Sequence, residues 1–303
     1  MGIHAGKKIE NMNTISIENK KYPKLLKKIG KNAPKQLYYK GSWDDEIFKN
    51  CLAVVGSRRM TTYGRQVIER IVGEVAAAGL TIVSGFMYGV DAAAHKAALN
   101  FGGRTIAVMP CGIDLIHPEY QQDLYVEILN NKGLVISEYE GNMQPVNWTY
   151  PQRNRIVAGL SKAALIVEAG EKSGSLITAK WAKKFKRKLF VVPGPITSEN
   201  SKGIMQLIKG GAVPVSSAKD ILEYYKIKFQ ITNHRSQINT KSQTPNSKMT
   251  IEHNILEKLH IEPTEIDELA RCLGIPVSEL GVTLSMMQLK GLIQQQGNKY
   301  YLA

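Results

Sequence analysis

From residue 52 onward, short apolar runs alternate with longer amphipathic stretches, and this alternation constrains the fold more than any other feature of the chain. Short apolar runs are typical of strands that are buried on both faces of a sheet, and amphipathic stretches between them indicate crossover helices. The pattern therefore predicts a parallel sheet. Its strands are expected at residues 52–56, 80–85, 105–110, 134–138, 163–169 and 189–193.

Helices are expected between these strands and after them, at residues 62–78, 89–101, 119–130, 152–160, 175–185, 203–209 and 218–225. Because consecutive parallel strands require right-handed crossovers, the helices must lie on both faces of the sheet. The predicted fold class is α/β, an extended Rossmann-like parallel sheet. Ligands of such sheets bind beyond the carboxyl ends of the strands.

Composition divides the chain into four segments. Residues 1–50 are expected to form an N-terminal lead-in with an edge strand of its own, and residues 51–225 the Rossmann-like domain. Residues 226–249 contain 5 Lys and Arg and no Asp or Glu, which predicts a basic linker. Residues 250–303 predict a small winged-helix domain, with helices at 251–260, from a Thr264 cap to about Gly274 and at 278–290, then a hairpin at 292–296 and 299–302.

The net charge of +14 points to an anionic partner, and its distribution locates that partner. Residues 250–303 carry 4 Lys and Arg against 7 Asp and Glu, so the excess positive charge lies in residues 1–249. We find no apolar run long enough for a membrane span and no secretory signal, which predicts a cytoplasmic protein. The three cysteines form no Cys-x-x-Cys pair, and neither disulfides nor a zinc site is expected.

Two turns after the first two strands have the residues of an anion site. Gly56-Ser57-Arg58 leads to Tyr63 and Gly64 at a helix start, where unpaired N–H groups and the helix dipole attract anions; a purely structural turn is an equal alternative. The second turn repeats the arrangement with Ser84, Gly85, Phe86 and Gly89. The Gly-x-Gly-x-x-Gly pattern is missing, so no nicotinamide or flavin cofactor is expected. In the helix that follows, Asp91 is expected to cap and His95 to pack, not to catalyse.

A third segment, Arg153-Asn154-Arg155, places two cations in the first turn of a helix, where the dipole disfavours them unless an anion compensates. The alternative is that either arginine pairs with an acid such as Glu138 or Glu168.

The fourth segment opens a helix with a lysine, two serines, a glycine and a threonine, which resembles a phosphate cradle: Lys172, Ser173, Gly174, Ser175 and Thr178. The Walker spacing is absent, which disfavours nucleotide hydrolysis.

Several phosphate-type turns on one sheet edge predict a row of phosphates, as in a polynucleotide. Aromatic residues that could stack on its bases occur in the same segments, namely Tyr63, Phe86, Tyr88, Trp148 and Tyr150.

Over residues 20–225 the chain resembles the DprA family, also called Smf. The resemblance rests on residues 55–58, 84–95, 111–118, 151–161, 172–178, 192–194, Gly203 and 210–212. It implies a homodimeric, non-enzymatic protein that binds single-stranded DNA, protects it and loads RecA recombinase on it during natural transformation. It also implies that Arg58 is the principal DNA contact, and that the helical SAM-like domain of many relatives is absent or reduced. The C-terminal domain resembles the winged helix of many members.

Two other functions remain open. A nucleotide phosphoribohydrolase of the LOG or lysine-decarboxylase-like group shares this sheet, but its Pro-Gly-Gly-x-Gly-Thr-x-x-Glu signature is missing. A winged-helix transcription regulator would read duplex DNA, yet residues 278–290 offer a single lysine. We therefore expect a DNA-binding protein without cofactor or metal.

Overall fold

The computed structural model describes residues 13–227 and 251–302, except residues 262 and 290. The chain divides into two compact units, residues 1–232 and 233–303, and each is described by itself. The predicted linker lies, from residue 228 on, outside the described residues.

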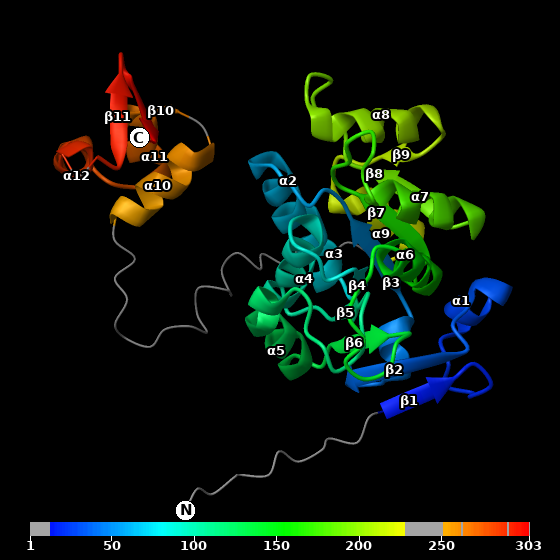
Figure 1. Cartoon of the computed structure of the whole chain (residues 1–303). Helices are drawn as coiled ribbons and strands as arrows, with labels where there is room; N and C mark the ends of the chain where they lie inside the picture. Colours follow the sequence, from blue (N-terminus) through cyan, green and yellow to red (C-terminus); the bar gives the residue numbers. More distant parts are fainter. Residues whose placement is uncertain (1–12, 228–250, 262, 290, 303) are drawn as a thin grey trace, which may run out of the picture. The chain divides into compact units, whose positions relative to one another are not determined.

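In the described part of the first unit, nine strands form one sheet in the order β1-β2-β6-β5-β4-β3-β7-β8-β9 (Figure 1). The α/β, Rossmann-like fold is confirmed. The sheet is not purely parallel, however, because β2 from the lead-in pairs antiparallel with β6 on one side and with β1 on the other. The strands are β1 Asn13–Ser16, β2 Gln36–Gly41, β3 Cys51–Val55, β4 Thr81–Ser84, β5 Thr105–Val108, β6 Leu134–Ser137, β7 Ala163–Ile166, β8 Lys188–Val191 and β9 Val213–Pro214.

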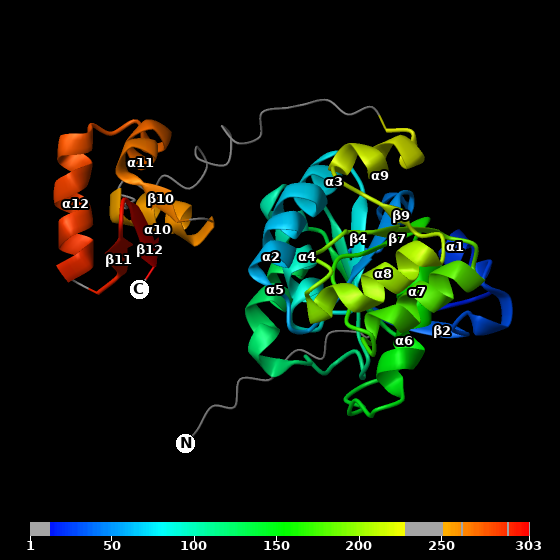
Figure 2. The ribbon, with the colours of Figure 1, turned by 90° about the horizontal axis from the view of Figure 1, so that it is seen from above.

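Helices cover both faces of the sheet (Figure 2). One face packs against α1 Lys24–Lys27, α6 Thr149–Leu160, α7 Ser175–Lys184 and α8 Lys202–Lys209. The other packs against α2 Thr62–Val67, α3 Gly73–Ala77, α4 Val90–Asn100, α5 Gln122–Asn130 and α9 Ala218–Tyr225. The single helix expected at 62–78 is interrupted by a π-helical segment, Ile68–Val72, between α2 and α3.

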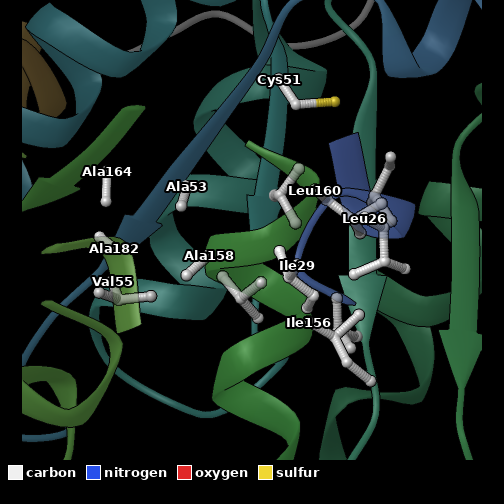
Figure 3. Close-up of a cluster of buried hydrophobic side chains, with 14 of the residues drawn as sticks. Leu26, Ile29, Cys51, Ala53, Val55, Ile156, Ala158, Leu160, Ala164 and Ala182 are labelled. Carbon is white, nitrogen blue, oxygen red and sulfur yellow. The ribbon is translucent and has the colours of Figure 1, made fainter. Parts of the chain in front are cut away.

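The core forms because successive strand residues point to opposite faces. In β3, Ala53 and Val55 join the cluster under α6, whereas Leu52 and Val54 join the cluster under α4, and all four are buried. Figure 3 shows the first cluster, which includes small alanines from strands (Ala53 and Ala164) and from helices (Ala158 and Ala182). Burial on both faces explains the continuous apolar runs of the sequence.

The second unit is a winged-helix fold of α10 Ile251–Ile261, α11 Ile266–Leu273 and α12 Val277–Leu289 with strands β11 Ile293–Gln296 and β12 Lys299–Leu302. The expected Thr264 cap is wrong, because Thr264 lies in a short strand, β10 Thr264–Glu265, that pairs with β12 at Tyr300. Gly274 ends α11 with a positive φ of 66°. Over the described residues, no single helix could cross a membrane; α11 and α12, bent by 113°, pass as a pair by length and composition alone.

His95 packs inside the first unit, on α4, as the sequence predicted. Its Nδ1 lies 2.6 Å from the Thr105 hydroxyl. Thr105 already donates its proton to the Ile82 carbonyl, so Nδ1 must be the donor. Nε2 then faces the core as an unprotonated nitrogen, with no hydrogen-bond partner among the described atoms. Burial, with a smaller effect from the charge of Arg153, lowers the pKa of His95 to about 3.

This histidine predicts acid sensitivity. Below the ordinary pKa of about 6.5, His95 binds a proton in the unfolded chain but stays neutral in the folded chain. The free energy of unfolding therefore falls as pH drops from 6.5 toward 3. We expect the free energy of unfolding to be about 2 kcal/mol lower at pH 5 than at pH 7 through this group alone. Urea denaturation at the two pH values measures it. A folded His95→Gln variant should lose the difference; an unchanged difference in His95→Gln would contradict the assignment.

Candidate nucleic-acid interface

The order of the strands reverses at β3, which has β4 on one side and β7 on the other. Ligands of open α/β sheets bind at such a switch point, outside the carboxyl ends of the strands. Here the loops after β3, β4 and β7 and the start of α6 surround a cavity of about 590 Å³.

Most of the predicted site residues line this cavity together. They are Gly56, Ser57, Arg58, Gly85, Arg153, Asn154, Lys172, Ser173, Gly174, Ser175 and Thr178. Among the lining residues the cations are Arg58, Arg59, Arg153 and Lys172, and the only acid is Asp91. The wall is therefore positively charged.

Arg58 is exposed and lies between two tyrosine rings. Its guanidinium carbon is 5.5 Å from the centre of the Tyr88 ring and 5.3 Å from that of Tyr150. The Tyr150 hydroxyl is 2.8 Å from Nε2 of His117, which orients that ring. Cation–π contacts on two sides restrict the guanidinium without neutralising it, so its donors stay available to an anion.

Helix N-termini add to the positive potential of the cavity. Neither α6 nor α7, whose first residues line the cavity, has an acidic residue in its first turn, so no carboxylate of that turn offsets the helix dipole. At the start of α7, the hydroxyls of Ser173 and Ser175 lie 2.8 Å apart and Ser175 N donates to Ser173 Oγ at 3.4 Å. Asn154 of α6 donates to the Gly174 carbonyl, which joins the two helix starts. Backbone N–H groups and hydroxyls of this kind bind phosphate oxygens.

The loop after β3 is fixed by its neighbours. Arg59 N donates to Ser57 Oγ at 3.0 Å, and Asn200 Nδ2 donates to the Arg59 carbonyl at 2.7 Å. Gly89 has a φ of +79°, and a side chain there would collide with the Ser57 carbonyl oxygen. Asn200 was not among the predicted residues, although the rule that ligands bind at strand ends would have pointed to the segment after β8.

Arg153 faces the cavity but is 3% exposed, and its guanidinium donates to the carbonyls of Gly85 and Val108. Burial lowers its pKa to about 10, against the opposing charge of Asp91, so it remains a cation at neutral pH. Burial likewise raises the pKa of Asp91, against the lowering effect of Arg153. Arg153 therefore connects the loops after β4 and β5 to α6.

Three predicted contacts need correction, because their side chains are buried away from the cavity. Arg155 donates to Glu138 at 2.5 Å, which is the alternative that the sequence left open. The Ser84 hydroxyl donates to the Val54 carbonyl inside the sheet. Phe86 is fully buried, with a positive φ of 58°, and packs in the cluster with Tyr125.

The predicted residues Tyr63 and Gly64 lie beside a second cavity of about 190 Å³, which Tyr63 lines. The Tyr63 hydroxyl donates to the Pro193 carbonyl at 2.7 Å, and Gly64 packs against the carboxylate of Glu168. That carboxylate accepts hydrogen bonds from the amide and hydroxyl of Thr61. The described residues contain no group of three or more His, Cys, Asp or Glu that could hold a metal ion.

Comparison with known proteins identifies the family. Residues 13–226 match the family model for DNA recombination-mediator protein A. The chain belongs to this family, the DprA family. Residues 239–299 match the DprA winged helix domain.

Among relatives of this DprA family member, DprA of Streptococcus pneumoniae is 39% identical over 223 residues, which is 74% of this chain and 78% of that protein. Smf of Escherichia coli is 36% identical over 242 residues, 80% of this chain and 65% of that protein.

Two solved structures share the fold. The Streptococcus pneumoniae DprA structure has a TM-score of 0.66 at 37% identity, covering 73% of this chain and 76% of its own. The Helicobacter pylori DprA structure, which concerns that protein's single-stranded DNA binding mode, has a TM-score of 0.64 at 32% identity. The match covers 73% of this chain and 98% of that chain.

Proposed function

We propose that this DprA family member is a cytoplasmic, homodimeric recombination mediator that binds single-stranded DNA in the cavity at the switch point. It protects incoming DNA and delivers it to RecA recombinase during natural transformation. In this proposal the protein binds and presents a strand and performs no catalysis.

One observation carries the proposal: Arg58, held between Tyr88 and Tyr150, lies in the same cavity as the starts of α6 and α7, neither with an acid in its first turn. Phosphates are the anions that such donors bind best, and aromatic rings beside them accept unstacked bases. A duplex keeps its bases paired, so a site that combines phosphate donors with exposed rings favours a single strand.

The second unit supports the assignment of DNA to the first. Its net charge is negative over residues 250–303, with 4 Lys and Arg against 7 Asp and Glu. Along α12, Val282, Met286 and Leu289 are exposed, so this helix presents apolar side chains where a major-groove reader presents cations.

A gel-shift comparison of single- and double-stranded oligonucleotides of one sequence, at two salt concentrations, tests the proposal. We expect tighter binding to the single strand. We also expect log affinity to fall against log salt with a slope of about 0.7 per phosphate bound, because binding releases counterions. Equal or tighter binding to the duplex would contradict the proposal. Release of free base from nucleoside monophosphates would favour the phosphoribohydrolase alternative instead.

A further inference from the structure

A row of rings continues from Arg58 to a residue outside the predicted site, Tyr120. The centre of the Tyr120 ring is 6.5 Å from that of Tyr88, the ring that contacts Arg58. Tyr120 is 71% exposed and Tyr88 41%. Two aromatic rings this exposed bury little surface against each other, so their contact stabilises the fold only weakly.

Buried contacts fix the two backbone segments that carry these rings. Tyr120 lies in a 3₁₀ turn, Glu119–Gln121, and the neighbouring Gln121 side chain is 7% exposed. Its amide donates to the Phe86 carbonyl at 3.0 Å, which ties the turn to the loop that carries Tyr88. Phe86 itself is fully buried among Tyr125 and His95. The backbone under both tyrosines is therefore fixed, while the rings project into solvent.

Charge beside Tyr120 indicates which part of a nucleic acid would meet it. Glu119 is exposed next to Tyr120, and Asp123 lies in the first turn of α5. Carboxylates repel phosphates, so this end of the row has no attraction for the DNA backbone. Its exposed rings offer stacking surface, which every base can use regardless of sequence.

The spacing of the rings favours a single strand. Bases in one strand of a duplex follow each other at about 3.4 Å. The ring planes of Tyr88 and Tyr120 are also inclined by 42°, so bases that stack on the two rings cannot stay parallel to each other, which a paired and stacked duplex resists.

We propose that Tyr88 and Tyr120 form a base-stacking platform that extends the DNA site beyond the phosphate cavity, toward α5. The inference rests on the proposed function, since it assumes that Arg58 contacts the same strand. The platform binds bases, whereas the cavity binds phosphates, so the two contribute differently to salt dependence.

Binding of an oligothymidylate to full-length variants, measured at several salt concentrations, tests the platform. Tyr120→Ala should weaken binding by about 5-fold or more, the effect of one lost stacking contact, and leave the salt slope unchanged. Tyr120→Phe should bind as the unmodified chain does, because it keeps the ring. Val126→Ala, which removes an exposed apolar side chain from α5 nearby, is the matched control and should have no effect.

A second arm uses an oligonucleotide with the bases removed and the backbone intact. The unmodified chain should bind it more weakly, and Tyr120→Ala should lose less affinity on it than on oligothymidylate. If the unmodified chain binds single-stranded DNA and Tyr120→Ala binds within about twofold of it, the platform is wrong and the phosphate site stands. If the unmodified chain binds no single-stranded DNA, both proposals fail.

Discussion

Arg58→Ala should weaken the binding of single-stranded DNA by about 10- to 100-fold, the value of a hydrogen-bonded contact to a charged group. Arg58 is an exposed cation that lines the cavity, and Tyr88 and Tyr150 hold it in place. The loss should be similar for all sequences, because a phosphate contact carries no base information. Loss of one phosphate contact should also reduce the salt slope by about 0.7.

Fluorescence anisotropy with labelled oligonucleotides at several salt concentrations measures both quantities. Arg70→Ala is the matched control, because Arg70 is exposed in the segment Ile68–Val72 and does not line the cavity. It should leave affinity nearly unchanged. A folded Arg58→Ala variant with normal affinity would place the DNA elsewhere on the molecule.

Arg153→Met should lower the free energy of unfolding by about 3 kcal/mol, the cost of removing one member of a buried, hydrogen-bonded charge network. The Arg153 guanidinium donates to the carbonyls of Gly85 and Val108. Burial raises the pKa of Asp91, and the positive charge of Arg153 lowers it. Methionine fills similar space but leaves two carbonyls without this donor and Asp91 without its nearby cation. Urea denaturation at pH 7 measures the loss.

A double-mutant cycle with Asp91→Asn tests the reason for this loss. The asparagine side chain carries no charge, so Arg153→Met should cost less in that background than in the unmodified chain. A fully stable Arg153→Met variant that has lost DNA affinity would show the opposite role, in which Arg153 binds phosphate directly.

The sequence predicted the sheet because its central strands are buried on both faces and so stand out as apolar runs. β3 and β7 are of this kind. The lead-in is harder to interpret, since β1 is an edge strand, β2 is its neighbour, and both carry mostly exposed or half-buried residues. The antiparallel pairing of β2 with β6 and with β1 depends on tertiary contacts that no local pattern reveals.

The candidate site could likewise be predicted only in part. The turns that line the cavity could be predicted, because the carboxyl ends of neighbouring parallel strands meet at one edge. The direction of individual side chains could not. Arg153 and Arg155 are two residues apart on α6, about 200° around the helix axis, so only one can face the cavity. The other reaches Glu138. Asn200 was missed because it follows a strand whose turn has no phosphate-type pattern.

The segments that line the cavity begin at Val55 and end at Asn200, and the chain between them includes most of the central sheet. No short peptide of this protein contains the whole surface. Binding energy is therefore gained only when the unit folds cooperatively, and by linkage a bound ligand stabilises the complete fold by RT ln(1 + [L]/Kd). A strand of DNA bound in this cavity would therefore protect the first unit against thermal unfolding and proteolysis, even at positions far from any nucleotide.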